Sequence, residues 1–275
     1  MKQAYLTIDD SPTKHTNDFV DWLAARDIPA VFFCIGSSYT DLGIPCEGME
    51  QRPAPILKAI SHGYIIGNHT YTHPRFSDLS LAEMKEQVLK TEKIIETLYR
   101  QAGKSRSHKL FRFRDLDRGC GTWVVDFNKT GPHTETIQEL FLKGVNLKAV
   151  TPTAADFEKK EAFQDFLRAE GFSADVYKDI TFDWYKDTEL AEAVDSLCTY
   201  STSDWMINPD FKEYAKDWPY QSVEALKQKI ADDSWLASEE SSNIILAHDH
   251  NHLFTHTTAL LEDMLHQGIH FREFK

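Results

Sequence analysis

The chain alternates short apolar runs with longer segments that repeat an apolar residue every three or four positions. The runs at residues 4–8, 31–35, 64–66 and 244–246 are rich in aromatic and β-branched residues and have the length of strands buried on both faces. The clearest helical segment begins with a capping box formed by Ser80 and Glu83. Because strands that alternate with helices form parallel sheets, the pattern predicts an α/β fold. In such folds functional side chains gather at the carboxyl ends of the strands.

Polar residues able to bind a metal follow two of these runs. Asp9 and Asp10 end the first run, and neighbouring strand residues point in opposite directions, so one carboxylate can bind metal while the other acts as a base. His69 and His73 follow the third run and are four residues apart, a spacing that places two imidazoles on one face of a helical turn. Two imidazoles and one carboxylate leave a zinc-like ion one open position for water, as in hydrolytic sites. Without the carboxylates, a lone His-x-x-x-His is more often a chance pattern.

His248 follows the last apolar run, where a strand end would reach the same site. Alone it would be interpreted as a core histidine, but this position favours a functional role. The neighbouring histidines are interpreted as surface or packing residues; they are His250, His252, His256, His266 and His270.

Three separated motifs resemble those of the polysaccharide deacetylases, carbohydrate esterase family four. They are Thr-Ile-Asp-Asp at residues 7–10, His-Thr-Tyr-Thr-His at residues 69–73 and Ile-Leu-Ala-His-Asp at residues 245–249. The resemblance extends over residues 1–112 and 243–275.

Two further motifs of the family are matched only in part. Phe111 and Arg112 resemble the start of the third motif, but Arg114 and Asp115 stand where proline and tyrosine are expected. The pair Asp183-Trp184 resembles the fourth motif, although the preceding Asp179 lies one residue further away than the family spacing.

The resemblance implies a set of roles for these residues. Asp10, His69 and His73 would hold one divalent ion, with zinc expected and cobalt, nickel or manganese as alternatives. Asp9 would be the base that activates water, His248 the acid that protonates the departing amine, and Arg112 the residue that orients Asp9. Asp115, Asp183 and Trp184 would contact the substrate. The Asp115 amide replaces that of the family's oxyanion-binding tyrosine, and its carboxylate would oppose a developing negative charge.

The fold implied by the resemblance and by the alternation is an irregular (β/α) barrel of seven strands in one domain, residues 1–275. Residues 114–235 form a divergent middle region. Strands are expected there at residues 122–127, 148–150 and 176–182, and a helix near residues 190–197. The aromatic residues of the segment 200–222 either line a sugar site or pin a loop to the core; they are Trp205, Tyr214, Trp218 and Tyr220.

Composition narrows the class of partner. The net charge of −13 and the absence of clustered lysine and arginine argue against nucleic acid and against an anionic membrane surface. No run approaches the ~20 apolar residues that span a bilayer. The first strand begins within a few residues of Met1, which leaves no room for an export signal and favours the cytoplasm unless a signal has been removed. The four cysteines lack the spacing of a zinc site or a disulfide framework.

The sequence therefore predicts a metal-dependent hydrolase that removes an acetyl group from an N-acetylated, or in second place an O-acetylated, sugar or glycan. Two alternatives remain open. One is a metal-dependent amidohydrolase for a non-sugar amide or imide. The other is a carbohydrate-binding relative with impaired catalysis, which the altered third and fourth motifs suggest. The oligomeric state is left open.

Overall fold

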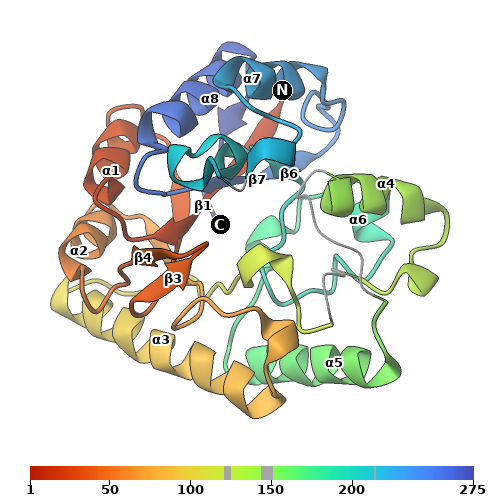
Figure 1. Ribbon diagram of the computed structural model, residues 1–275, viewed down its shortest axis with the longest axis horizontal. Helices are drawn as coiled ribbons and strands as arrows, with labels where there is room; N and C mark the ends of the chain where they lie inside the picture. Colours follow the sequence, from red (N-terminus) through yellow and green to blue (C-terminus); the bar gives the residue numbers. More distant parts are fainter. Residues whose placement is uncertain (121–124, 144–150, 214) are drawn as a thin grey trace.

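A parallel sheet with the first strand at its centre organises the molecule (Figure 1). The computed structural model describes residues 1–120, 125–143, 151–213 and 215–275. In these residues the main sheet has six strands. Five of them lie in the order β5-β2-β1-β7-β6, and the sixth, β8, pairs with the first residues of β1. Every pairing is parallel. A separate antiparallel hairpin is formed by β3 and β4.

The strands of the described residues are β1 (Gln3–Ser11), β2 (Ala30–Cys34), β3 (Tyr39–Asp41), β4 (Ile44–Cys46), β5 (Ile65–Asn68), β6 (Tyr200–Ser201), β7 (Ser242–His248) and β8 (His270–Phe271). The α-helices are α1 (Thr16–Ala24), α2 (Pro53–Ser61), α3 (Leu81–Gln101), α4 (Thr134–Gln138), α5 (Ala154–Ala169), α6 (Asp183–Lys186), α7 (Val223–Asp232) and α8 (Phe254–His266). The capping box expected at Ser80 is present and begins α3.

The alternation of side chains along β1 divides the core into two layers. Leu6 and Ile8 belong to an apolar cluster that includes residues of α1, α2, α7 and α8, whereas Tyr5 belongs to a second cluster that contains residues of the segment 176–198. Thr7 lies on the Tyr5 side, where its hydroxyl accepts a hydrogen bond from Arg112 at 2.6 Å. One face of the sheet is thus covered by helices and the other faces an interior that contains polar groups.

Backbone hydrogen bonds across residues 110–112 and 196 bridge the gap between β5 and β6. Asn68 N donates to the Leu110 carbonyl at 2.8 Å and Arg112 N donates to the Asn68 carbonyl at 3.0 Å. On the other side, Ser196 N donates to the Phe111 carbonyl at 2.7 Å. The expected irregular α/β barrel architecture is confirmed, but the described sheet has six strands, and residues 110–112 stand in the place of a seventh strand.

Two of the secondary-structure predictions for the middle region are wrong. Residues 176–182 do not form a strand but a 3₁₀ turn at Asp175–Tyr177 followed by irregular chain, and residues 190–197 are not a helix. Their apolar side chains are nevertheless buried in the interior cluster, so the periodicity reflected burial and not a regular element. The strand expected at residues 148–150, part of that at 122–127, and Tyr214 lie outside the described residues.

A cluster of phenylalanines supports the segment that contains Arg112. Phe163 of α5 is fully buried, and its ring centroid lies 5.8 Å from that of Phe111 and 5.5 Å from that of Phe113. Phe76 contacts the same rings from the turn before α3. Edge-to-face contacts of this kind add to the free energy gained by burying each ring.

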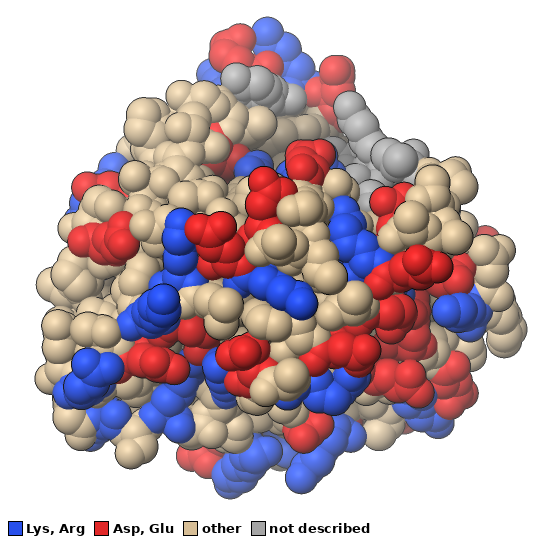
Figure 2. Space-filling model, turned by 90° about the horizontal axis from the view of Figure 1, so that it is seen from below, with Lys and Arg blue, Asp and Glu red and all other residues tan. Residues whose placement is uncertain are grey.

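The chain has 43 acidic and 30 basic residues. On the face in Figure 2, acidic and basic side chains are interspersed, so this face presents no broad basic area. Among the described residues, none of the helices has the length and hydropathy that a membrane crossing requires. The four cysteines are all free.

Replacement of Phe163 should destabilise the whole domain. We expect Phe163→Ala to lower the free energy of unfolding by about 3–5 kcal/mol, because the lost ring leaves a cavity that the surrounding rings cannot fill. Phe166→Ala is the matched control, since Phe166 lies on the same helix but is only partly buried. Urea-induced unfolding measures both changes, and an equal cost for the two variants would contradict the assignment of Phe163 to the core.

Candidate metal centre and active site

A non-helical loop after β5 brings the two histidines together. The expectation of a helical turn is wrong, because residues 69–73 form a bend in which Thr70 and His73 have φ values of 73° and 55°. Side chains hold this shape: the Asn68 side-chain oxygen accepts from Thr70 N at 2.9 Å, and the Thr70 hydroxyl accepts from His73 N at 3.1 Å. The imidazole centroids lie 4.9 Å apart.

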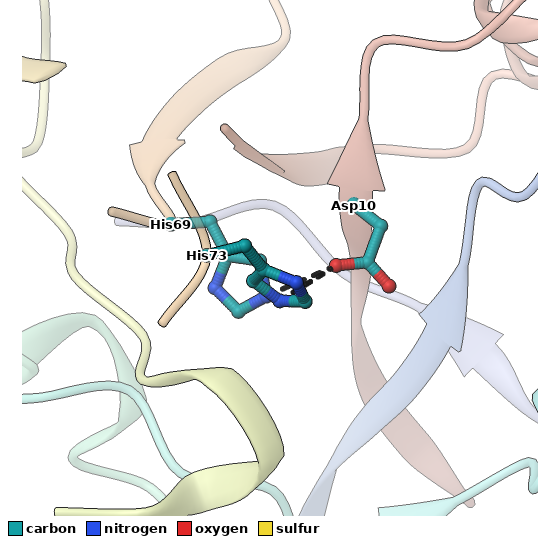
Figure 3. Close-up of side chains that lie close together, drawn as sticks. All are labelled: Asp10, His69 and His73. Atoms are coloured by element: carbon teal, nitrogen blue, oxygen red, sulfur yellow. Dashed lines mark ion pairs between the residues drawn. The ribbon is translucent and has the colours of Figure 1, made fainter. Parts of the chain in front are cut away.

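Asp10 reaches the same place because its backbone leaves the strand conformation. Simple alternation would turn Asp10 away from Asp9, towards the helices. Its φ of 68° instead places it in the left-handed region, which aspartate tolerates better than most residues. The side chain consequently turns towards the histidines, as Figure 3 shows.

Asp10, His69 and His73 form a site whose atoms suit a divalent ion. Nε2 of His69 and Nε2 of His73 lie 3.3 and 3.1 Å from Asp10 Oδ1 (Figure 3). Two ligands of a tetrahedral zinc, each at about 2.0–2.1 Å from the ion, are about 3.3 Å apart, so this spacing fits. Asp10 Oδ1 is buried and accepts no hydrogen bond from the described residues. A metal ion bound at this site would provide a partner for this oxygen. This is the one such cluster of metal-binding residues in the described part of the chain.

The hydrogen bond of His69 and the ionisation of Asp10 also suit metal binding. The His69 Nδ1 atom lies 2.8 Å from the Arg112 carbonyl, which can only accept, so in the neutral ring Nδ1 carries the proton and Nε2 presents its lone pair. Burial alone would raise the pKa of Asp10, but the charge of His73 and the hydrogen bond from His250 hold this pKa well below its usual value. Asp10 is therefore the ionised carboxylate that a metal requires.

Arg112 holds Asp9 in the interior next to this cluster. The Arg112 guanidinium donates to Asp9 Oδ1 at 2.8 Å, and both side chains are buried. The other oxygen, Asp9 Oδ2, lies 3.7 Å from His69 Nε2. The structure thus brings Asp9 and Arg112 together with the metal-binding residues, as the sequence predicted.

His248 forms an ion pair with a residue that the sequence analysis did not single out. His248 Nδ1 lies 2.7 Å from Asp204 Oδ1, and the second Asp204 oxygen accepts from His248 N at 2.9 Å and from the Thr257 hydroxyl at 2.8 Å. Burial alone would lower the pKa of His248, but the charge and hydrogen bond of Asp204 outweigh it and raise this pKa to about 9. His248 is therefore protonated at neutral pH and can donate a proton.

One cavity of about 320 Å³ joins these groups. Asp9, Asp10, His69, His73 and His248 line it. The remaining walls differ in character: one is aromatic and is formed by Trp205, Phe211 and Trp218, and another is charged and is formed by Asp41, Arg75, Arg114 and Asp115. A volume of this size accommodates one sugar unit, and aromatic faces are suited to stack against its apolar face.

Asp115 lies at this cavity, but Asp183 and Trp184 do not. Asp183 is exposed and pairs with Lys186 at 2.7 Å, one turn along α6. Trp184 is buried in the interior cluster, stacked on Phe182 with ring centroids 5.7 Å apart. The apolar environment of Trp184 therefore keeps the pair away from the site.

Another Asp-Trp pair, Asp204-Trp205, is the one that reaches the cavity. Asp204 binds His248 and Trp205 lines the aromatic wall. The pair lies three residues after the short strand β6, an element that the sequence analysis did not identify. His250, which was interpreted as a surface or packing residue, also reaches the site: its Nε2 atom lies 2.6 Å from Asp10 Oδ2.

Comparison with known proteins agrees with this geometry. Residues 1–114 match the family model described as Polysaccharide deacetylase. The match contains the motifs at residues 7–10 and 69–73, so the resemblance seen there is confirmed. The match contains the candidate metal-binding residues as well as Asp9 and Arg112, whereas His248 and Asp204 lie beyond it.

Curated proteins similar to this deacetylase-like chain are sugar deacetylases. A peptidoglycan-N-acetylglucosamine deacetylase of Bacillus cereus is 33% identical over 94 residues, which are 34% of this chain and 30% of the relative. A chitooligosaccharide deacetylase of Bradyrhizobium is 32% identical over 102 residues, 37% of this chain and 42% of the relative. The matched residues thus span less than half the length of these relatives.

Solved structures resemble the deacetylase-like chain over its whole length. A polysaccharide deacetylase from Bacillus cereus has a TM-score of 0.56 at 20% identity and covers 100% of this chain and 93% of that chain. A family 4 carbohydrate esterase from Streptomyces lividans in complex with acetate has a TM-score of 0.54 at 17% identity, with the same coverage. At these identities the likeness supports the fold alone.

The pairing of His248 with Asp204 should be visible in a titration. In metal-free protein we expect an NMR-measured pKa of about 9 for His248, falling towards or below the ordinary value of about 6.5 in Asp204→Asn, which removes the charge. Because the folded-state pKa is raised, the pair contributes its full stability below the ordinary pKa and loses it as the pH rises through about 9.

Asp210→Asn is the control for this titration. Asp210 pairs with the exposed His252 at 2.6 Å and should leave the pKa of His248 unchanged. An unshifted His248 pKa in Asp204→Asn would show that Asp204 does not govern its protonation.

Proposed function

We propose that this chain is a metal-dependent hydrolase that removes the acetyl group from an N-acetylated, or in second place an O-acetylated, sugar or glycan. The observation that carries the proposal is that Asp9, Asp10, His69, His73 and His248 line one cavity, with Arg112 bonded to Asp9 and Asp204 bonded to His248. These are the groups that amide hydrolysis requires: a site for a Lewis acid, a general base and a general acid.

Asp10, His69 and His73 would hold one divalent ion, with zinc first and cobalt, nickel or manganese as alternatives. When bound, the ion supplies Lewis-acid activation of the acetyl carbonyl and of water. Asp9 would accept the proton of the attacking water through Oδ2, because Oδ1 is already bonded to Arg112. Arg112 orients Asp9 and leaves only this oxygen facing His69.

His248 would protonate the departing nitrogen. Its raised pKa keeps the proton on the imidazole at neutral pH, and Asp204 fixes the ring by bonding to Nδ1, which leaves Nε2 as the donor. Amide cleavage needs such an acid, because an unprotonated amine is a poor leaving group. Asp9 would thus accept a proton and His248 would donate one.

Asp115 and Trp205 would contact the substrate. Asp115 can offer its backbone amide to the developing oxyanion, and the cost of its own carboxylate is reduced because Arg114 Nε lies 3.4 Å and Arg75 Nε lies 4.0 Å from Asp115 Oδ2. Trp205 and Trp218, with ring centroids 4.6 Å apart, provide an aromatic wall for a sugar. The curated relatives are named for acetylated glucosamine polymers and oligomers, which is the substrate class we infer.

The proposal is tested by measuring acetate release from N- and O-acetylated glycans. We expect release from at least one N-acetylglucosamine oligomer with added zinc or cobalt and its loss with chelator. Release of no acetate, combined with binding of the same oligomers, would indicate a binding protein. Hydrolysis of simple amides or cyclic imides without activity on sugars would favour the non-sugar amidohydrolase.

The two neighbouring aspartates should respond differently to mutation. Asp10→Ala should remove both metal and activity, whereas Asp9→Asn should keep the metal but lower kcat by about 10²- to 10⁴-fold, because asparagine cannot accept the proton of water. Elemental analysis beside kcat under metal-saturating conditions measures both effects. Metal-free Asp9→Asn protein, or one with the wild-type rate, would mean that the roles of Asp9 and Asp10 are exchanged.

A further inference from the structure

We propose that His250 is a positioning residue that fixes which oxygen of Asp10 faces the metal. The inference rests on the proposed metal site and adds a residue to it from a distant part of the chain. His250 Nε2 lies 2.6 Å from Asp10 Oδ2, whereas Asp10 Oδ1 faces His69 and His73. The carboxylate therefore has one oxygen held by protein and one left without a hydrogen bond.

A short chain of hydrogen bonds sets the direction of this contact. Asp210 N donates to Asn208 Oδ1 at 3.0 Å, which fixes the orientation of the Asn208 amide. Its Nδ2 group can only donate, and it lies 3.3 Å from His250 Nδ1, so Nδ1 is the acceptor and the proton of the neutral ring is on Nε2. Nε2–H then donates to Asp10 Oδ2. Asn208 thus selects the tautomer that can hold Asp10.

The surrounding structure keeps His250 in this position. The strand register pairs Asp9 of β1 with His248 of β7, and Asp249 N donates to the Asp9 carbonyl at 2.9 Å. His250 follows directly, beside Asp10. Its side chain is only 11% exposed, and Phe211 packs edge-on against the ring with centroids 5.4 Å apart. The imidazole therefore has little freedom to rotate away from Asp10.

The consequence is a preorganised ligand. A free carboxylate rotates and offers either oxygen or both to an ion, whereas a carboxylate whose second oxygen is bonded presents one oxygen in a fixed direction. The left-handed backbone of Asp10 makes such support useful, because the strand does not itself define where the side chain points. Partners of this kind usually change metal affinity by about 10- to 100-fold.

The test compares zinc affinity in three full-length variants by competition with a chromophoric chelator. His250→Met keeps the approximate size but removes the donor and should weaken zinc binding by about 10- to 100-fold. His250→Gln places an amide donor near the position of Nε2 and should recover most of the affinity. His252→Met is the matched control, since His252 lies two residues away, is 48% exposed and pairs with Asp210; its zinc affinity should equal that of the wild type.

Thermal unfolding of the metal-free variants shows whether each is folded, so that a lost fold is not taken for lost positioning. Wild-type zinc affinity in folded His250→Met would overturn the inference while leaving the proposed function intact. Failure of the wild-type protein itself to bind zinc, cobalt, nickel or manganese would instead overturn the proposed metal site. X-ray absorption of the zinc-loaded wild type should show two imidazole ligands. Three would make His250 a ligand and also overturn the inference.

Discussion

The buried guanidinium of Arg112 is the group on which the site and the closure of the sheet both depend. It donates to Asp9 and Thr7 of β1 and to the carbonyls of Ser196 and Leu197, and it lies 4.4 Å from the centroid of the Phe33 ring on β2. The carbonyl of the same residue accepts from His69. Removing one partner of a buried ion pair costs about 3–5 kcal/mol, because the other charge is left without compensation. Asp9, His69 and the irregular edge of the barrel are thus linked through one residue.

Backbone strain is concentrated at the same place. Asp10, Thr70, His73 and Asp115 all have positive φ values, and each residue other than glycine in this region costs on the order of 1–3 kcal/mol. The structure offsets this cost locally with side-chain acceptors. The Gln87 side-chain oxygen, for example, accepts from both Tyr71 N and Thr72 N at 2.9 Å. The strain is tolerated because it turns these side chains towards one point, whereas a regular strand or helix would direct them elsewhere.

Two histidine–carboxylate pairs at the end of β7 illustrate how environment separates the roles of similar residues. In the first pair, Asp204 is buried and binds His248 through two contacts, so the imidazole is charged and can act as an acid. In the second pair, Asp10 is shared with His69 and His73, and Asn208 orients the His250 ring so that Nε2 faces Asp10. The same residue types thus provide a proton donor in one case and a support in the other.

The sequence by itself determined the class of fold and the centre of the site. Short apolar runs indicated buried parallel strands, and the polar residues that follow them, Asp9, Asp10 and His248, had to lie at one edge of the sheet because parallel strands end together. The spacing of the two histidines and the motif that contains Arg112 identified three further residues of the site, His69, His73 and Arg112. These features are local, and local patterns can be recognised directly in an amino-acid sequence.

Tertiary structure alone decided which residues complete the site. Asp204 and His250 come into place through the register of β7 against β1 and the irregular segment after β6, and nothing in their immediate neighbours indicates these partners. The prediction that Trp184 contacts the substrate was wrong for the same reason. An Asp-Trp pair has the same sequence whether the tryptophan ring lines a cavity or is buried in the core. The left-handed backbone at Asp10 and His73 is likewise stabilised by contacts distant in the chain, so neither local propensity nor spacing could predict it.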